Sequence, residues 1–343
     1  MLPRLRNSYS SLIKGGKKVM DAVVQKALRE VQVKTKNSVP WKADEVWKQD
    51  CHTWTGTEWT PKATSSGEDS KLSSLALYSW NVDFMLPYAD SRMGKAIEHL
   101  QSLIPRDSSP STANVVFFQE CLDSDIKLMA SHPWIRDTFA MSDLDTSNWQ
   151  SGHYGTISLI DRRLPIASIF RVHYSATRME RDGLFVDVKL QDKAIRLCNT
   201  HLESLALEPP NRIPQMKLCA EYMHSSEVDG AIVAGDFNAI QDFDRTLHSE
   251  NGLKDAFLEQ GGNEDDPKGH TWGHQAATAL RMQFGTSRMD KVYFSGGVQL
   301  SSFEKFGADI CVDDAQEKKD IVGLGFDEPW ITDHLGVKAV FRV

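Results

Sequence analysis

The segment Ile232-Val-Ala-Gly-Asp-Phe-Asn238 passes from small and apolar residues to a carboxylate and an amide within a few positions. A short apolar run that contains β-branched residues is typical of a buried strand. Acidic and amide side chains are rarely buried unless they are paired or bound to a metal ion. The segment therefore predicts a core strand whose end carries two functional residues, Asp236 and Asn238.

The same transition from an apolar run to polar side chains recurs along the chain. Strand-like runs are followed by Asn81, Asp83, Glu120, His201 and Glu203, and others are preceded by Asp290, Asp333 and His334. Glu120 alone could be a surface or helix-capping acid, and His201 alone could be a core histidine. Asp236 with Asn238 could form an Asx turn. The recurrence at strand ends instead predicts one shared site.

The apolar and polar patterns predict an α+β fold. Eight runs are expected to be strands: 75–82, 114–118, 156–160, 184–190, 194–199, 231–234, 291–294 and 337–342. Helical spacing occurs at 91–103 and 213–223. Residues 61–74 are rich in Ser, Thr and charge, which indicates a linker. We therefore expect an N-terminal extension over 1–60 and one domain over 75–343 that carries the site.

Composition limits the classes of function. The net charge of −8 argues against a protein that coats nucleic acid through bulk positive charge, so a polyanion would be held by a local cleft or a metal ion. The five cysteines are scattered without paired spacing, which favours a reducing, intracellular compartment over a disulfide framework or a zinc site. No apolar run is long enough for stable membrane insertion.

The N-terminal extension is basic. Between residues 1 and 38 there are nine Lys or Arg against two acids. Apolar residues recur there at helical spacing, which predicts an amphipathic helix: Met20, Val23, Val24, Ala27, Leu28 and Val31. Such a helix could dock on the main domain, act as a mitochondrial transit peptide, or form an arm that contacts nucleic acid or directs the chain to the nucleus. The sequence leaves these alternatives open.

The ordered motifs resemble those of the endonuclease/exonuclease/phosphatase superfamily, which includes deoxyribonuclease I. They are Ser79-Trp-Asn-Val-Asp83, Phe118-Gln-Glu120, Thr200-His-Leu-Glu203, Gly235-Asp-Phe-Asn238, Arg288-Met-Asp290 and Thr332-Asp-His334. Within that superfamily, Ala176-Thr-Arg-Met-Glu-Arg181, the helix containing Arg212 and His270-Thr-Trp272 are similar to type-2 tyrosyl-DNA phosphodiesterases. The chain departs from the animal enzymes at Phe237, where they carry Thr, and at His153-Tyr-Gly155, where they carry Tyr-Phe-Thr.

The resemblance implies a fold, a reaction and a cofactor. The expected fold is a deoxyribonuclease I-like four-layer α/β sandwich, with two mainly antiparallel sheets flanked by helices. The expected activity is Mg²⁺-dependent hydrolysis of 5′-phosphotyrosyl–DNA bonds, with Mn²⁺ as a possible substitute. DNA 5′ ends, some of them linked to protein, would be the partner, and a nuclear or cytoplasmic monomer is expected.

Roles for single residues follow from side-chain chemistry and motif position. Glu120 is assigned as the principal metal ligand, with Asn81 and Asp333 as further ligands, because hard cations select oxygen. Asp236 would activate the attacking water, with Asn238 holding it in line. His201 and His334 would donate to phosphoryl oxygens, with Asp290 as the partner of His334. The substrate-binding residues are predicted to be Arg181, Ser204, Trp272 and Arg288.

Three alternatives share part of this pattern. The core motifs do not name the leaving group, so another nuclease, such as a poly(A) exonuclease, fits them. An inositol-phosphate or sphingomyelin phosphoesterase fits less well, because inositol 5-phosphatases carry Pro-Ala-Trp-Cys-Asp-Arg where this chain has Ser287-Arg-Met-Asp-Lys-Val. A non-catalytic binding module fits least, because every core position holds a competent residue.

Overall fold

The computed structural model describes residues 38–62, 71–104 and 110–343. The amphipathic helix predicted near residues 20–31 and residues 63–70 of the predicted linker lie outside this part of the chain. None of the helices in the described ranges is both long and apolar enough to cross a membrane.

The strands form two sheets. The seven-stranded sheet has the order β1 (Val46–Lys48), β8 (Ile166–His173), β9 (Asp182–Leu190), β10 (Lys193–Thr200), β11 (Gly230–Asp236), β13 (Asp290–Gly296) and β12 (Lys254–Asp255). The eight-stranded sheet has the order β14 (Gln299–Phe306), β15 (Gly336–Arg342), β4 (Ser74–Asn81), β5 (Thr112–Cys121), β7 (Gly155–Asp161), β6 (Phe139–Met141), β2 (His52–Trp54) and β3 (Trp59–Pro61).

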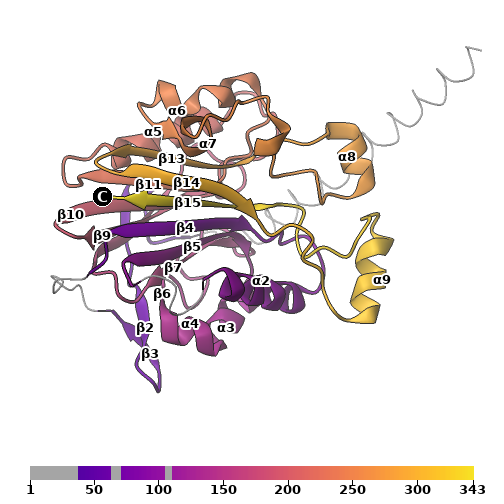
Figure 1. Ribbon diagram of the computed structural model, residues 1–343, viewed down its shortest axis with the longest axis horizontal. Coiled ribbons are helices and arrows are strands. Elements are labelled where there is room, and N and C mark those ends of the chain that lie inside the picture. The colour runs from indigo at the N-terminus through magenta and orange to yellow at the C-terminus, as the bar shows by residue number, and fades with distance from the viewer. Residues whose placement is uncertain (1–37, 63–70, 105–109) are drawn as a thin grey trace, which may run out of the picture.

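The sheets pack face to face, and helices cover their outer faces. In the view of Figure 1, α5 (Arg212–Met223), α6 (Leu247–Glu250) and α7 (Ala256–Glu259) lie above the sheets, and α2 (Ala89–Leu103), α3 (Asp123–Ser131) and α4 (Pro133–Thr138) lie below them. The other helices in the described ranges are η1 (Asp242–Arg245), η2 (Pro267–Gly269), α8 (Thr278–Phe284) and α9 (Ala315–Gly323). The predicted four-layer sandwich is confirmed.

Alternate side chains of a central strand belong to two different hydrophobic cores, one on each face of the sheet. In β5, Val115 and Phe117 belong to the core between the two sheets. Val116 and Phe118 belong to the core under α2, α3 and α4. Successive side chains of a strand point to opposite faces, so a central strand that is apolar at every position is buried on both sides. The long apolar runs in the sequence therefore correspond to strands at the centre of the sandwich.

Each sheet contains one parallel pair among otherwise antiparallel neighbours. In the eight-stranded sheet β4 and β5 are parallel, and the chain crosses between them through α2. In the seven-stranded sheet β10 and β11 are parallel, and α5 makes the crossover. The antiparallel neighbours β15 and β13 begin at the edge where these pairs end. That edge is the end of β15 opposite the C-terminus, towards α8 and α9 on the right of Figure 1.

The eight predicted strands and the helices predicted over 91–103 and 213–223 are present, but the sheets also contain strands that the sequence pattern did not indicate. The three-residue strands β1, β2 and β3 pair with β8, β6 and each other, although residues 46–61 were expected in the extension and linker. Three residues are too few to show alternation, and the partners of β1 and β2 in the larger sheets, β8 and β6, lie far away in the sequence. The described part of the sandwich therefore begins at Val46, well before residue 75.

A fully buried arginine ties β8 to β9 and to the segment after β6. The guanidinium of Arg171 lies 2.8 Å from Asp143 and 3.0 Å from Asp182. It also donates to Thr156, through both the hydroxyl and the backbone carbonyl. One cation thus satisfies two carboxylates from different parts of the chain.

Replacement of this arginine should be strongly destabilising. In Arg171→Met both carboxylates stay buried without their partner, so we expect the free energy of unfolding in urea to fall by about 3–5 kcal/mol. The control is Arg245→Met, which removes an exposed pair with Asp265 and should leave the urea midpoint unchanged. Equal midpoints for the two variants would contradict a stabilising role for the buried cluster.

Candidate active site

The polar residues that follow or precede the central strands meet at one edge of the sandwich. Asn81 ends β4, Asp236 ends β11, and His201 directly follows β10. Asp290 pairs with Asp236 in the strand register and begins β13. Both sheets therefore supply side chains to the same site.

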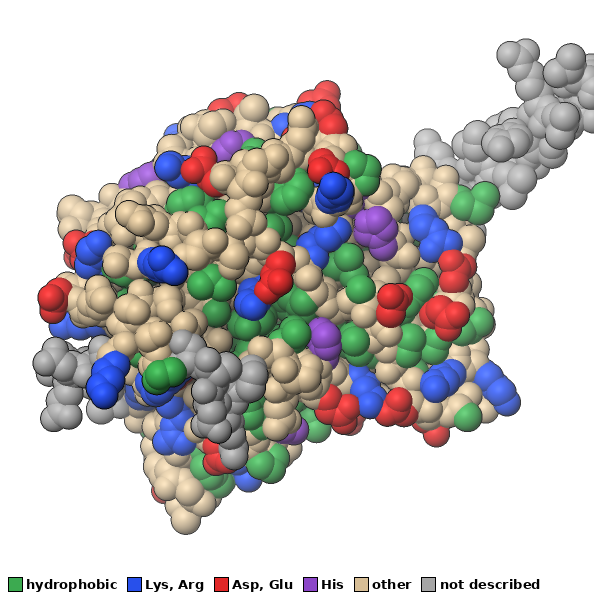
Figure 2. Space-filling view, viewed as in Figure 1, with side chains coloured by type: hydrophobic (Ala, Val, Ile, Leu, Met, Phe, Trp, Pro, Cys, Tyr) green, Lys and Arg blue, Asp and Glu red, His purple; other side chains and the backbone are tan. Residues whose placement is uncertain are grey.

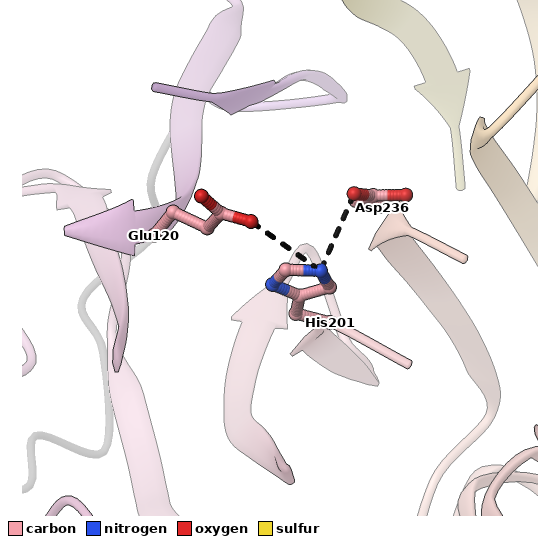
Figure 3. A group of neighbouring side chains, drawn as sticks. All are labelled: Glu120, His201 and Asp236. Atoms are coloured by element: carbon pink, nitrogen blue, oxygen red, sulfur yellow. Dashed lines mark ion pairs between the residues drawn. The ribbon is translucent and has the colours of Figure 1, made fainter. Parts of the chain in front are cut away.

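Glu120, His201 and Asp236 form its centre (Figure 3). The two carboxylates lie on either side of the imidazole: Nε2 of His201 is 3.3 Å from Oδ2 of Asp236 and 3.8 Å from Oε1 of Glu120. Oxygen and nitrogen atoms of these three residues lie within 4.8 Å of one another, so a metal ion held by a carboxylate would lie beside the ring. The three residues come from β5, the segment after β10, and β11.

Asp236 is held in place by neighbouring donors. Its carboxylate accepts hydrogen bonds from Nδ2 of Asn81 at 3.0 Å and from the backbone N–H of Asn238 at 2.8 Å. Burial would raise the pKa of Asp236, but His334, His201 and the Asn238 hydrogen bond outweigh burial and lower it below its ordinary value. The carboxylate is therefore ionised at neutral pH and can accept a hydrogen bond from water.

Glu120 and Asp333 carry an unbalanced negative charge. Burial and the nearby Asp83 carboxylate raise the pKa of Glu120 to about 7 and that of Asp333 to about 6. A divalent cation would offset both effects, and carboxylate oxygens suit Mg²⁺ or Mn²⁺. The backbone of Glu120 has φ 61°, a conformation that is uncommon for a non-glycine residue and that clusters at active sites. The residues present thus fit a hard divalent cation.

The amide of Asn81 is already engaged on both sides. Its carbonyl oxygen accepts from the backbone N–H of Asp83 at 2.9 Å, and its nitrogen donates to Asp236. A second lone pair on the carbonyl oxygen stays available to a cation. Direct ligation by Asn81 and by Asp333 therefore stays a prediction.

His334 is paired with Asp290. Nδ1 of His334 lies 2.8 Å from Oδ2 of Asp290, and both side chains are buried. Burial would lower the pKa of His334, but Asp290, Asp236 and Asp333 raise it well above its ordinary value. The ring therefore carries a positive charge at neutral pH beside Asp236.

His201 is paired at Nδ1 with a cation, in contrast to His334, which is paired with a carboxylate. Arg181 donates to Nδ1 of His201 at 2.8 Å and to the hydroxyl of Ser204 at 2.9 Å. Burial and Arg181 lower the pKa of His201 to about 4, so the ring is neutral. The predicted residues Arg181 and Ser204 thus lie at the site, in contact with a catalytic candidate.

Trp272 contacts the site through its indole N–H. That group donates to Oδ2 of Asp333 at 2.7 Å, and only 8% of the residue is exposed. Trp272 is one of the predicted substrate-binding residues. Most of its ring is covered and its indole N–H binds Asp333, so contact with substrate stays a prediction.

The structure does not bring the Arg288 guanidinium to the site, and this corrects its assignment as a substrate-binding residue. It donates to Asp255 at 2.7 Å and also binds Glu264. The arginine is buried, and both carboxylates neutralise it. It anchors the start of β13 and so supports Asp290 two residues further on.

Two features of the site were not predicted. Phe84 donates its backbone N–H to Oε2 of Glu120 at 3.0 Å, and its ring stacks on Tyr154 at a centroid distance of 4.4 Å. Arg212 donates to the backbone carbonyls of Glu203 and Leu205 and also pairs with Asp244. It thereby joins the segments that follow β10 and β11. The Arg212 motif gave a signal in the sequence, but Phe84 gave none.

A two-sheet sandwich whose central strands direct carboxylates, amides and two histidines to one edge defines a class of hydrolytic folds suited to phosphate esters. The chain belongs to the Endonuclease/Exonuclease/phosphatase family, which matches residues 78–334.

The curated proteins to which the chain is similar are tyrosyl-DNA phosphodiesterases. The chain is 24% identical over 251 residues to the 5′-tyrosyl-DNA phosphodiesterase of Caenorhabditis elegans, covering 70% of this chain and 63% of that protein. The chain spans less than two thirds of the length of the curated relatives that it matches.

Solved structures share the fold. Danio rerio TDP2 complexed with a single-strand DNA product has a TM-score of 0.57 and 18% identity, covering 79% of this chain and 99% of that chain. The Bacteroides thetaiotaomicron mannosyl-6-phosphatase Bt3783 has a TM-score of 0.54 and 16% identity, covering 78% of this chain and 100% of that chain. At these identities the likeness establishes the fold and leaves the substrate open.

Replacement of Glu120 should weaken binding of a divalent cation. We expect Glu120→Gln to lower the affinity for Mn²⁺, measured by isothermal titration calorimetry, by at least roughly tenfold, because a neutral amide replaces a charged ligand. The control Glu98→Gln changes an exposed glutamate on α2 and should bind Mn²⁺ as the unmodified chain does. An unchanged affinity in Glu120→Gln would exclude Glu120 as a ligand.

Proposed function

We propose that this protein is a Mg²⁺-dependent phosphodiesterase that hydrolyses 5′-phosphotyrosyl bonds at DNA ends, with Mn²⁺ as a substitute. The observation that carries the proposal is the convergence of Glu120, Asp236, His201 and His334 within one buried site. The likeness to a 5′-tyrosyl-DNA phosphodiesterase supports the choice of substrate.

The chemistry requires a positioned water and compensation for the charge of the phosphate. Asp236, ionised and fixed by Asn81 and Asn238, would accept the proton of the attacking water. A divalent cation bound at Glu120 would withdraw charge from the phosphoryl oxygens. His201 and His334 would donate hydrogen bonds to those oxygens as their charge increases in the transition state.

A tyrosine leaving group requires little general-acid catalysis from this site. Its hydroxyl has a pKa of about 10, so the leaving phenolate needs little help from a general acid. The charged ring of His334 would supply a proton where one is required. A sugar hydroxyl, which is more basic, would depend more strongly on this residue.

Binding of DNA would depend on the site rather than on bulk charge. On the face shown in Figure 2, acidic and basic side chains of the described residues are interspersed, in keeping with the net charge of −8. A protein that binds phosphates through a cation and a few buried donors does not need a broad basic surface. If DNA is the substrate, the protein would act in the nucleus, or in mitochondria if the basic segment 1–38 is a targeting signal.

The direct test uses a single-stranded oligonucleotide with a 5′-phosphotyrosine end. We expect release of a 5′-phosphate end with Mg²⁺ and no release with chelator. Asp236→Asn should lower kcat/KM by at least roughly 100-fold, because the amide cannot take up the proton. The control Asp242→Asn changes an exposed acid in η1 and should retain full activity.

Other substrates separate the alternatives. An unmodified oligonucleotide, poly(A), a sugar phosphate and an inositol phosphate are offered under the same conditions. Cleavage of one of these without release of tyrosine would contradict the proposed substrate while leaving the metal-dependent reaction in place. Undiminished turnover in Asp236→Asn would contradict the proposed role of Asp236.

A further inference from the structure

The two histidines of the site are held at Nδ1 by partners of opposite charge. Nδ1 of His334 lies 2.8 Å from the carboxylate of Asp290. Nδ1 of His201 lies 2.8 Å from Nη1 of Arg181. A carboxylate accepts a hydrogen bond from the ring, whereas a guanidinium has donors only and never accepts. Nδ1 of His334 therefore carries a proton, and Nδ1 of His201 does not.

The arginine determines which ring nitrogen of His201 carries the proton. Because Arg181 donates to Nδ1, this nitrogen must be the acceptor, and the single proton of the neutral ring lies on Nε2. Nε2 is buried and has no hydrogen-bond partner among the described residues. It lies 3.3 Å from Oδ2 of Asp236 and 3.8 Å from Oε1 of Glu120. An N–H donor whose nearest acceptor is the carboxylate of Asp236 thus faces the centre of the site.

Arg181 is itself held by the turn that carries it. Its backbone N–H donates to the hydroxyl of Thr177 at 3.1 Å, and that hydroxyl donates to the buried carboxylate of Glu203 at 2.7 Å. Its Nη2 donates to Ser204, so both terminal nitrogens are engaged within the protein. The side chain is only 5% exposed. This arrangement fixes the arginine against His201 before any substrate binds.

We propose that Arg181 is a positioning residue that holds His201 as the Nε2–H tautomer, so that the ring presents a neutral donor to a phosphoryl oxygen. The alternative tautomer would direct a lone pair at that oxygen and repel it. A charged ring would repel a cation bound at Glu120. The role of His201 towards a phosphoryl oxygen rests on the proposed function, whereas the tautomer itself does not.

The test combines a spectroscopic and a kinetic measurement on the full chain. Two-dimensional ¹H–¹⁵N correlation spectra of ¹⁵N-histidine-labelled protein report which ring nitrogen carries the proton, with His201→Asn used for assignment. We expect the Nε2–H form in the unmodified protein and a measurable fraction of Nδ1–H form in Arg181→Met. Arg181→Lys keeps a donor near Nδ1 and should retain more of the Nε2–H form than Arg181→Met does.

Kinetics on the phosphotyrosyl oligonucleotide distinguish positioning from direct binding of phosphate. Arg181→Met should lower kcat by roughly 10- to 100-fold with a smaller change in KM, since a transition-state hydrogen bond is lost. The control Arg178→Met removes an exposed arginine of the same turn and should change neither the spectrum nor kcat.

The spectra test the effect of Arg181 on His201, and the oligonucleotide assay tests the proposed substrate. An unchanged His201 tautomer in Arg181→Met, or a rise in KM with kcat preserved, would overturn the positioning role and favour a phosphate clamp. Loss of the Nε2–H tautomer in Arg181→Met, in a protein that releases no tyrosine from the oligonucleotide, would uphold the effect of Arg181 on His201 and contradict only the proposed substrate.

Discussion

A parallel pair of strands requires a crossover connection, and in this protein each sheet contains one such pair. Helix α2 makes the crossover in one sheet and α5 in the other. Because the carboxyl ends of parallel strands meet at the same edge, the residues that end β4 and β5 lie opposite those that end β10 and β11. The packing of the two sheets then closes the site, and the antiparallel neighbours β13 and β15 bring Asp290 and His334 to it.

Some carboxylates at this edge are neutralised by neighbouring histidines and others are not. This difference indicates which residues bind a cation and which act on the substrate. Asp236 lies between two histidines and keeps its negative charge. Glu120 and Asp333 lie near Asp83 at partly buried positions, without comparable compensation, which is the environment that a divalent cation stabilises. The opposite partners of His201 and His334 make one ring neutral and the other charged. Glu120 and Asp333 are therefore suited to bind a cation, and the neighbouring histidines are suited to donate hydrogen bonds.

The sequence predicts the strand ends well, because a polar residue after a long apolar run has few structural explanations. It predicts less about partners that are distant in the chain. Arg288 lies in the right motif, yet Asp255 and Glu264 bind it away from the site. Trp272 was predicted only as a substrate-binding residue, and the sequence did not indicate that its indole binds Asp333. Only the folded structure shows which neighbour a long side chain reaches, and the same holds for Arg181 and His201.

The ends of β4 and β5 are expected to bind a divalent cation against Glu120. Anomalous diffraction from crystals of this protein soaked in Mn²⁺ would locate that cation. We expect one strong anomalous peak in contact with a carboxylate oxygen of Glu120, at the edge where Asp236 and the two histidines meet. A protein that remains free of Mn²⁺ at this edge, or binds it only elsewhere, would rule out this cation site.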